Sequence, residues 1–377
     1  MSQALEQAWA RHPLAAAAAA RSAEARARSD GASSLTPGAA SVSVSQLTDR
    51  PGSQRGRQEW ELEVAAPLWL PGQKAARQAE AEAVAAAVSA RQRASRLALA
   101  GELREAWWAV VGARQTRDLA ELRSTAAQRL QDDVMRRYRA GDLSRVDANL
   151  AQAEHLTAQG ERLDARLALQ QAEQTWWRLT GGSAPLALEL DTASVAAPAL
   201  DEDHPRLAAD LAEVRLARTR LALAAQFTRA SPELSLRAVR ERGEAGEPYA
   251  HSVGVRLTIP LVFGPQVRQQ RFDAQAELDQ AETALARLRE QLQADLARAR
   301  LELQVAREQS AASGQRRELA ADNLRLAEKS FALGEIDLGT LLRMRAAAFD
   351  AEAWHQRRLT SQAQAESRLR QTSGAMP

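Results

Sequence analysis

Residues 252–264 read Ser-Val-Gly-Val-Arg-Leu-Thr-Ile-Pro-Leu-Val-Phe-Gly, so apolar and polar residues alternate up to a proline and then a glycine. Residues 59–72 follow a similar order, Glu-Trp-Glu-Leu-Glu-Val-Ala-Ala-Pro-Leu-Trp-Leu-Pro-Gly. Alternation with a period of two predicts a β-strand that has one apolar and one polar face. We therefore expect each stretch to be a strand that leads through a corner with Pro and Gly into the next element.

These two stretches are copies within an internal duplication of the chain. Pro67 recurs as Pro260, 193 residues later. Residues 138–141, Tyr-Arg-Ala-Gly, recur at the same offset as Phe-Ala-Leu-Gly at residues 331–334. Matches that stay in register over a long separation indicate structural repeats. The predicted organisation is a first repeat over residues 1–182, a linker over 183–203 and a second repeat over 204–377.

Long helices are predicted to fill most of each repeat. No proline lies between Pro71 and Pro185 or between Pro265 and Pro377, and proline disrupts helix interiors. Apolar residues recur at steps of three and four over residues 278–292, the spacing of a coiled coil. Each repeat is therefore expected to contain a helix, a β-hairpin, a long helix, a tight turn and a second helix.

The composition excludes several classes of function. Lys and Arg total 50 against 48 Asp and Glu, a net charge of +2, so the basic excess of a nucleic-acid-binding protein is missing. The absence of cysteine excludes thiol catalysis and cysteine-type metal sites. The five histidines are scattered, and no constellation of catalytic residues is recognisable. We expect no enzyme activity, no metal site and no cofactor.

The sequence also limits how the chain could reach a membrane. No run approaches the 18 apolar residues of a transmembrane helix. Met1 leads directly into Ser2-Gln3-Ala4-Leu5-Glu6, without the charged and then apolar order of a secretory leader. If the protein is exported, we expect its leader, and any lipidated cysteine, to lie upstream of this sequence.

The doubled order of these motifs resembles the TolC-like outer-membrane efflux proteins over about residues 3–374. Within that family, the CzcC-like heavy-metal branch is the nearest. The motifs that carry the resemblance are the helix openings at 8–13 and 204–207, the strand-to-helix corners at 64–72 and 257–264, and the turns at 138–144 and 331–337.

This resemblance implies a fold that is mainly α-helical with a β-barrel portion. Each protomer would contribute long coiled-coil helices and four strands, and a homotrimer would form an α/β tube. The barrel would lie in the outer membrane and the helical tube in the periplasm. The implied function is a passive exit duct of a tripartite efflux system, which exports small molecules or metal ions received from an inner-membrane pump through a periplasmic adaptor.

The strand pattern agrees with a wall between lipid and water. Along residues 252–259, Val253, Val255, Leu257 and Ile259 would face lipid, while Ser252, Arg256 and Thr258 would face water. Trp60 and Trp69 stand where the aromatic belts of a membrane interface are expected.

The two tight turns are the predicted adaptor-contacting tips of the helical tube. The resemblance assigns this contact to Tyr138, Gly141, Leu143, Phe331, Gly334 and Ile336. Glycine would supply the left-handed conformation with which helices commonly end. The alternative is that these residues only turn one helix into the next.

The aperture of the tube is expected close to the tips. Family members often carry acidic residues six and nine positions after the second tip glycine, but this chain has Thr340 and Arg343 there. Asp147, six positions after the first tip glycine, is the acid that remains. A ring of Arg343 side chains would favour anions. The alternative is that Arg343 pairs with an acid on a neighbouring helix.

Two other functions remain open. A periplasmic adaptor also has a helical hairpin, but such a protein places a single hairpin within β-rich domains. A soluble coiled-coil scaffold would suit a chain without a leader, yet it has no need for four alternating segments.

Overall fold

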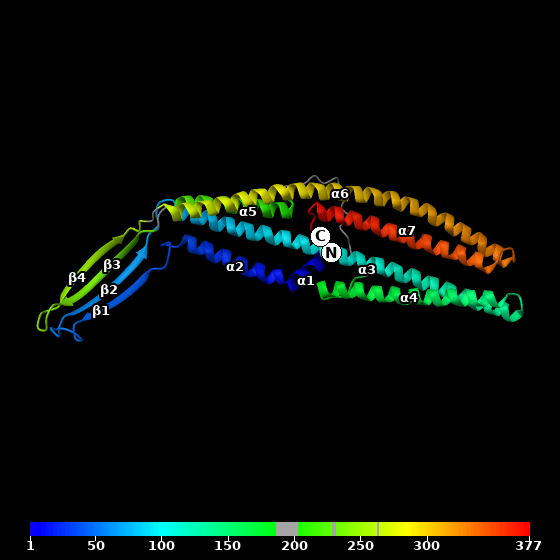
Figure 1. Cartoon of the computed structure of the whole chain (residues 1–377), viewed down its shortest axis with the longest axis horizontal. Helices are drawn as coiled ribbons and strands as arrows, with labels where there is room; N and C mark the ends of the chain where they lie inside the picture. Colours follow the sequence, from blue (N-terminus) through cyan, green and yellow to red (C-terminus); the bar gives the residue numbers. More distant parts are fainter. Residues whose placement is uncertain (186–202, 228–230, 262–263) are drawn as a thin grey trace. The chain divides into compact units, whose positions relative to one another are not determined.

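The computed structural model describes residues 1–185, 203–227, 231–261 and 264–377 (Figure 1). The first repeat contains α1 (Ser2–Arg11), α2 (Pro13–Ser33), β1 (Ser41–Thr48), β2 (Gln58–Pro67), α3 (Gln73–Ala140) and α4 (Arg145–Thr180). The second contains α5 (Pro205–Gln226), β3 (Glu233–Arg242), β4 (Ala250–Thr258), α6 (Pro265–Ala332) and α7 (Leu338–Thr372). The predicted mainly helical fold with four strands is confirmed.

The duplication is visible in the lengths and ends of the elements. Helices α3 and α6 both have 68 residues, and α4 and α7 have 36 and 35. Glycines with positive φ occur in pairs about one repeat apart, namely Gly72 and Gly264, Gly141 and Gly334, and Gly181 and Gly374. The same breaks in backbone direction are therefore used twice. The repeat bounds remain a prediction, and most of the predicted linker, residues 186–202, lies outside the described residues.

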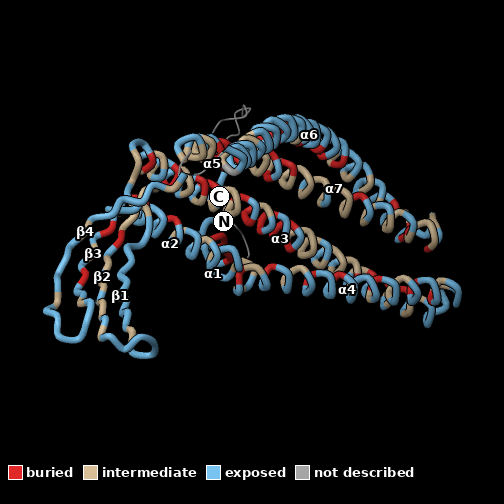
Figure 2. Tube along the Cα trace, turned by 60° about the vertical axis from the view of Figure 1, so that its left-hand side comes forward, coloured by how far each residue is buried: buried red, intermediate tan, exposed pale blue. Residues whose placement is uncertain are grey.

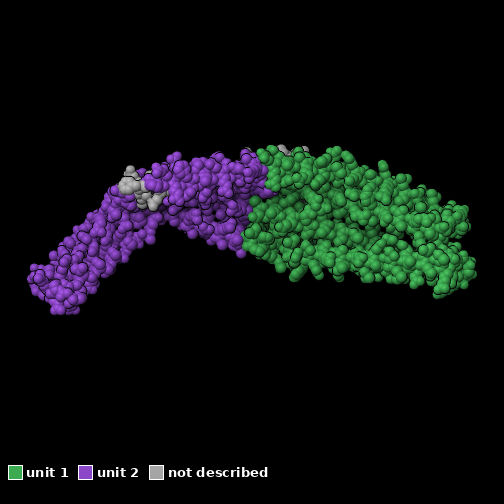
Figure 3. Space-filling view, in the orientation of Figure 1, with its two compact units in different colours: residues 1–15, 94–204, 290–377 green, residues 16–93, 205–289 purple. Residues whose placement is uncertain are grey.

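The chain divides into two compact units, and each takes segments from both repeats (Figure 3). Unit 1 contains residues 1–15, 94–204 and 290–377, and unit 2 contains residues 16–93 and 205–289. Helices α3 and α6 each contribute to both units. The compact units are thus a different division of the chain from the sequence repeats.

Unit 2 holds one antiparallel sheet in the order β1-β2-β3-β4. All four connections to helices leave from one end of the sheet, and the two hairpin loops lie at the other. Beside the sheet, Glu80 of α3 is buried and lies within 4.0 Å of Arg28 on α2, Arg77 on α3 and Arg220 on α5. This ion cluster ties together three helices of the unit.

Unit 1 is built from the helical hairpins α3/α4 and α6/α7. Near the tips, one apolar cluster joins Leu130, Val134, Ala151, Ala327, Phe331, Leu338 and Leu341. Farther from the tips, the rings of Trp107 and Trp176 meet edge to face at 5.9 Å. Arg104 of α3 donates hydrogen bonds to the side chain of Gln371 and to the carbonyl of Ala375. The C-terminal segment is thereby fixed to α3.

Among the described residues, no helix combines the length and the apolar character that crossing a bilayer requires.

Candidate functional site

One face of the sheet is apolar and exposed. The pairing aligns Val44, Leu62, Ala238 and Val253 in one row and Val42, Val64, Leu236 and Val255 in the next. Figure 2 colours much of this sheet as exposed. Val253 is 75% exposed and Leu236 56%. Contiguous apolar surface of this kind marks an interaction site for a membrane or another protein.

The opposite face of the sheet is charged. It carries Glu59, Glu61 and Glu63 of β2, and Arg237 of β3 lies 3.3 Å from Glu61. Arg256 of β4 lies 3.8 Å from Glu63. In β4 the pairing puts Ser252, Arg256 and Thr258 on this face and Val253, Val255 and Leu257 on the apolar one, as the alternation predicts. Ile259 follows the end of β4 and is exposed.

Both outer strands have a free edge within the described chain. β1 pairs only with β2, and β4 pairs only with β3. An unpaired strand edge is a template for pairing with another chain. The sheet is therefore open on two sides.

The two predicted interface tryptophans lie toward opposite ends of β2. Trp60 is 45% exposed on the apolar face near the hairpin loop. Trp69 follows the other end of the strand and is half-buried, with its indole N–H donating to the carbonyl of Ser34 at 3.2 Å. The nine steps between them span about 30 Å of extended chain. A strand tilt of about 40° reduces this to about 23 Å, close to the height of a lipid-facing apolar band.

The helix tips have the same backbone design in both repeats. Gly141 has φ of 87°, and the Asp142 N–H donates to the carbonyl of Arg137 at 2.9 Å. Gly334 has φ of 76°, and the Glu335 N–H donates to the carbonyl of Ser330 at 2.9 Å. Such six-to-one bonds after a left-handed glycine end a helix and satisfy its last carbonyls. The predicted turns are confirmed, whereas their contact with an adaptor stays a prediction.

The helices after the tips begin with side-chain caps. Ser144 Oγ accepts the Asp147 N–H at 3.2 Å, and the Asp147 carboxylate accepts the Ser144 N–H at 3.0 Å, which forms a capping box. At the second tip, the Asp337 carboxylate accepts the Thr340 N–H at 2.6 Å. Hydrogen bonds from Thr340, first of all from its backbone N–H, hold the pKa of Asp337 below its usual value.

The predicted tip residues differ in accessibility. Tyr138, Gly141 and Gly334 are exposed, and Leu143 and Ile336 are half-buried against the tip cluster. Phe331 is 8% exposed, and the guanidinium of Arg137 lies 5.1 Å from the centre of its ring. The Phe331 side chain thus joins the two hairpins instead of forming exposed surface in this chain.

The aperture candidates lie near the N-terminal ends of α4 and α7. Asp147 belongs to the capping box, and Arg343 is exposed and donates to Thr340 Oγ1 at 2.8 Å. Among the ion pairs of the described residues, none involves Arg343. The alternative pairing with an acid on a neighbouring helix is therefore not seen within one chain.

Sequence reasoning missed two exposed apolar seams in unit 1. The seam on α4 follows steps of three and four, and smaller or polar residues fill the positions between its exposed members. These members are Val146, Leu150, Leu156, Leu163, Leu167 and Trp177. On α6 the seam contains Leu301, Val305, Leu319 and Leu326, and Leu333 continues it directly after the helix. The α4 seam lies opposite the buried alanines with which α4 packs inside the chain. A count of heptads along α4 would have found it.

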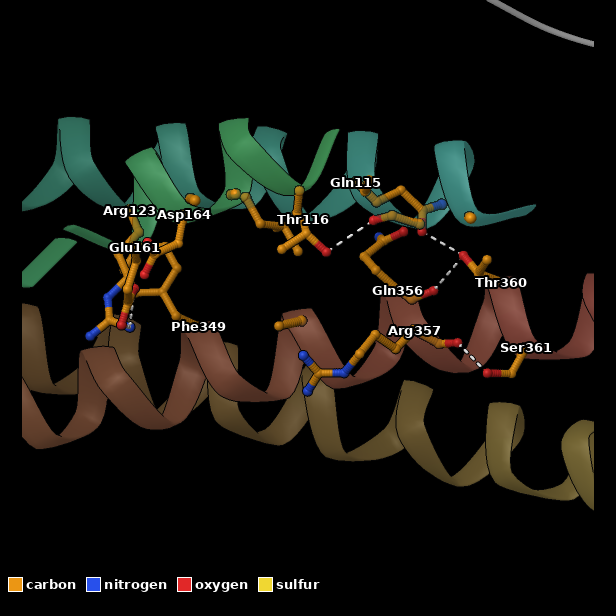
Figure 4. Close-up of a pocket in the computed structure, with 18 of the residues that line it drawn as sticks. Gln115, Thr116, Arg123, Glu161, Asp164, Phe349, Gln356, Arg357, Thr360 and Ser361 are labelled. Atoms are coloured by element: carbon orange, nitrogen blue, oxygen red, sulfur yellow. Dashed lines mark hydrogen bonds and ion pairs between the residues drawn. The ribbon is translucent and has the colours of Figure 1, made fainter. Parts of the chain in front are cut away.

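A groove of about 680 Å³ lies between α3, α4 and α7 (Figure 4). Gln115 of α3 accepts a hydrogen bond from Thr360 of α7, and Arg123 of α3 pairs with Glu161 of α4 at 2.8 Å. Its volume is that of a small-molecule site, and small residues such as Gly112 line it. The sequence carries no signal for this groove. In the described part of the chain, no group of three or more His, Asp or Glu residues could hold a metal ion.

Residues 190–375 match the family model described as Outer membrane efflux protein. This part of the chain is similar to the outer membrane efflux protein family. No curated protein sequence gives a significant match. The CzcC-like branch within the family stays a prediction.

Solved outer-membrane channels have the fold of this chain over almost its whole length. The CmeC channel of Campylobacter jejuni matches with a TM-score of 0.78 at 15% identity, covering 99% of this chain and 85% of its own. VceC of Vibrio cholerae matches with a TM-score of 0.78 at 17% identity, covering 99% of this chain and 95% of its own. CusC reaches a TM-score of 0.80 at 15% identity, covering 100% of this chain and 92% of its own. The predicted TolC-like fold is confirmed.

Proposed function

We propose that this chain is a passive exit duct in the outer membrane and one subunit of a tripartite efflux system. The observation that carries the proposal is the sheet, which has an exposed apolar face and a charged opposite face. A bilayer on one side and a water-filled lumen on the other would match both faces. The duct does no chemistry on its cargo of small molecules or metal ions. An inner-membrane pump supplies the energy.

The open sheet edges support a homotrimer. A strand edge with unpaired backbone groups is not tolerated in lipid, and four strands are too few to close a barrel. In the proposed trimer, β4 of each copy pairs with β1 of the next, and three four-stranded sheets close one barrel. Closure removes both edges of every copy.

The exposed seams support contact between copies in the helical part. In unit 1, α3 contacts α7 through Arg368 and Glu105 at 2.9 Å, so α3 and α7 lie together inside one chain. The seam of α4 and the seam of α6 are exposed apolar surfaces that a neighbouring copy could cover. In the proposed trimer, α6 of one copy packs against α4 of the next and closes the helical tube in the periplasm.

The helix tips are the proposed contact for the periplasmic adaptor. The exposed surface at the two turns includes Tyr138, Gly141 and Gly334, with Leu333 65% exposed beside them. The apolar cluster beneath holds both hairpins at the same level. A partner could therefore contact both turns of one chain at once.

Conductance across planar lipid bilayers tests the duct. We expect discrete conductance steps from membrane-extracted protein, and a reversal potential that shifts toward cations when Arg343→Glu replaces the proposed basic aperture. Arg345→Glu is the matched control, since Arg345 is half-buried and pairs with Glu328 at 2.8 Å. Protein that inserts in no bilayer would contradict the duct and favour an adaptor or a soluble scaffold. An unchanged reversal potential in the Arg343→Glu variant would contradict only the assignment of Arg343 to the aperture.

A further inference from the structure

The apolar face of the sheet ends in a positively charged rim at its hairpin end. Beyond the row of Val44, Leu62, Ala238 and Val253, the next row aligns Trp60 with Arg240 and Arg240 with His251. Arg242 follows two positions later on the same face. Arg240 and His251 are exposed, and Trp60 is 45% exposed. The rim patch is defined here as Trp60, Arg240, Arg242, Tyr249 and His251.

The charges of the two sheet faces are asymmetric. Glu59, Glu61, Glu63, Glu233 and Glu241 all fall on the charged face in the strand register. The strand positions of the apolar face include no Asp or Glu, and its charged residues are Arg240 and Arg242. Alternation and register thus place every strand carboxylate on the side away from the rim patch.

Aromatic and backbone contacts hold the two arginines in place. The guanidinium of Arg240 lies 4.1 Å from the ring centre of Tyr249, and that of Arg242 lies 5.0 Å from it. The Tyr249 hydroxyl donates to Gln58 at 2.6 Å, and Arg242 Nε donates to the carbonyl of Gly56 at 3.2 Å. Among the described residues, no ion pair involves Arg240 or Arg242. Two preorganised cations therefore share a patch without a neutralising partner.

One carboxylate of the hairpin loop, that of Glu247, is engaged within the loop. Glu247 Oε2 accepts the N–H groups of Gly243 at 3.0 Å and Glu244 at 3.2 Å. These hydrogen bonds organise the hairpin loop and engage one of the two carboxylate oxygens within it. The rim patch can therefore bind an anion through its two guanidinium groups, next to an apolar surface.

We propose that the rim patch binds the phosphate of a lipid headgroup, specifically of a phosphorylated glycolipid in the outer leaflet. The inference rests on the proposed function, which puts the apolar face in lipid. Arginine binds phosphate oxygens through two parallel N–H bonds. Trp60 and Tyr249 have the amphipathic character of interfacial side chains, and the apolar rows beside them provide the surface for acyl chains.

The topology decides between the two leaflets. Every connection from the sheet to a helix leaves from the end opposite the rim patch. With the helices on the periplasmic side, the patch lies at the outer surface of the membrane. The outer leaflet of such a membrane is built from phosphorylated glycolipid, whereas a phospholipid phosphate would be the ligand of a patch on the inner side.

Lipid binding by the purified full chain tests the proposal. Delipidated protein in detergent is titrated with bisphosphorylated lipid A, with the same lipid after dephosphorylation, and with phosphatidylglycerol. Native mass spectrometry measures how much of each lipid is bound. The test variant is Arg240→Gln/Arg242→Gln. The control is Arg237→Gln/Arg256→Gln, which removes one arginine of β3 and one of β4 from the charged face.

We expect bisphosphorylated lipid A to bind at least about tenfold more tightly than its dephosphorylated form, a difference of about 1.4 kcal/mol. The test variant should lose this preference and the control should keep it. Equal binding of both lipid A forms, or a test variant that binds like wild type, would overturn the phosphate site. Equal affinity for phosphatidylglycerol would overturn the assignment to the glycolipid.

Conductance separates failure of this inference from failure of the duct. Wild type and the test variant should both form channels in planar bilayers, because the rim patch lies on the apolar face and not on the charged face. A channel-forming wild type without phosphate preference contradicts the inference alone. A wild type that forms no channel contradicts the proposed function on which the inference rests.

Discussion

Gly141 and Gly334 set the tips of both helical hairpins through their backbone conformation. Their φ angles of 87° and 76° lie in the left-handed region, where a β-carbon is strained. A β-carbon on either would meet no atom within 4 Å. The requirement for glycine at these positions is therefore conformational and not steric.

The first prediction compares two glycines that both have open space around them. Gly141→Ala should lower the free energy of unfolding by about 1 kcal/mol, because alanine disfavours positive φ. Gly112→Ala should raise it by about 0.5–1 kcal/mol, because Gly112 lies inside α3 with nothing within 4 Å of an added β-carbon. Thermal unfolding of the purified variants measures both. Effects of the same sign would contradict the conformational explanation.

The second prediction concerns acid and the cap of α7. The pKa of Asp337 is lowered in the folded chain, so its carboxylate stabilises the helix above its ordinary pKa of 3.8. This stabilisation decreases as the pH falls below that value, when the folded carboxylate gains a proton. Asp337→Asn keeps a capping acceptor but should remove this part of the acid dependence. Unfolding midpoints measured from neutral pH to about pH 3 check it, and identical profiles of variant and wild type would contradict it.

Residue identities were predicted better than residue roles. The tip glycines followed from the doubled Tyr-Arg-Ala-Gly and Phe-Ala-Leu-Gly motifs, since their backbone requirement is local. The burial of Phe331 could not be predicted, because it depends on Leu130 and Val134 of the other hairpin. Long-range packing of this kind leaves no periodic trace around a single residue.

At the scale of elements, the alternation of the strands determines which face meets which environment. The period of two is enough to assign Val253 and Val255 to one face and Ser252 and Arg256 to the other. The rim patch needed more, since Trp60, Arg240 and His251 come together only through the pairing of β2, β3 and β4. Register between repeats is a tertiary property, and the sequence pattern does not encode it locally.

The third prediction uses neighbouring residues of β1. Val44 lies on the apolar face and Ser43 on the charged one, at almost the same depth. Val44→Arg should destabilise the membrane-inserted protein by about 2–4 kcal/mol, because it places a charge in the lipid. Ser43→Arg should be tolerated, since position 43 lies opposite Glu63. Unfolding in lipid vesicles by denaturant measures the difference, and equal tolerance of both substitutions would contradict a lipid-facing apolar face.

The fourth prediction tests the helical seams with disulfides. The tip cluster contains both Ala151 and Ala327, which fixes the level of α4 relative to α6. From this level, Leu156 of one copy should lie close to Leu319 of the next. Leu156→Cys with Leu319→Cys should therefore give covalent trimers on oxidation, on a chain that has no other cysteine.

The control for this cross-link lies in the same seam. Leu156→Cys with Leu301→Cys should give no cross-link, because Leu301 lies 18 positions farther along α6, about 27 Å at 1.5 Å per residue. Non-reducing gel electrophoresis distinguishes the two pairs. Equal cross-linking of both pairs, or of neither, would contradict the proposed packing of α6 against α4.

At the scale of the whole molecule, several surfaces of one chain lack partners. The described strands leave two free edges, and many of the exposed apolar residues lie on one sheet face and on two helix seams. Each would be energetically unfavourable in a monomer in water. A trimer in a bilayer removes all of them together, which is why we consider the surfaces parts of one assembly.

The trimeric duct is tested most directly by the mass of the particle extracted from membranes. The protein is taken from the outer-membrane fraction in mild detergent, and its mass is measured with correction for bound detergent. The account predicts a particle of about 123 kDa, three times the chain mass of 41.0 kDa. A protein that stays out of the membrane fraction as a soluble monomer or dimer would contradict it.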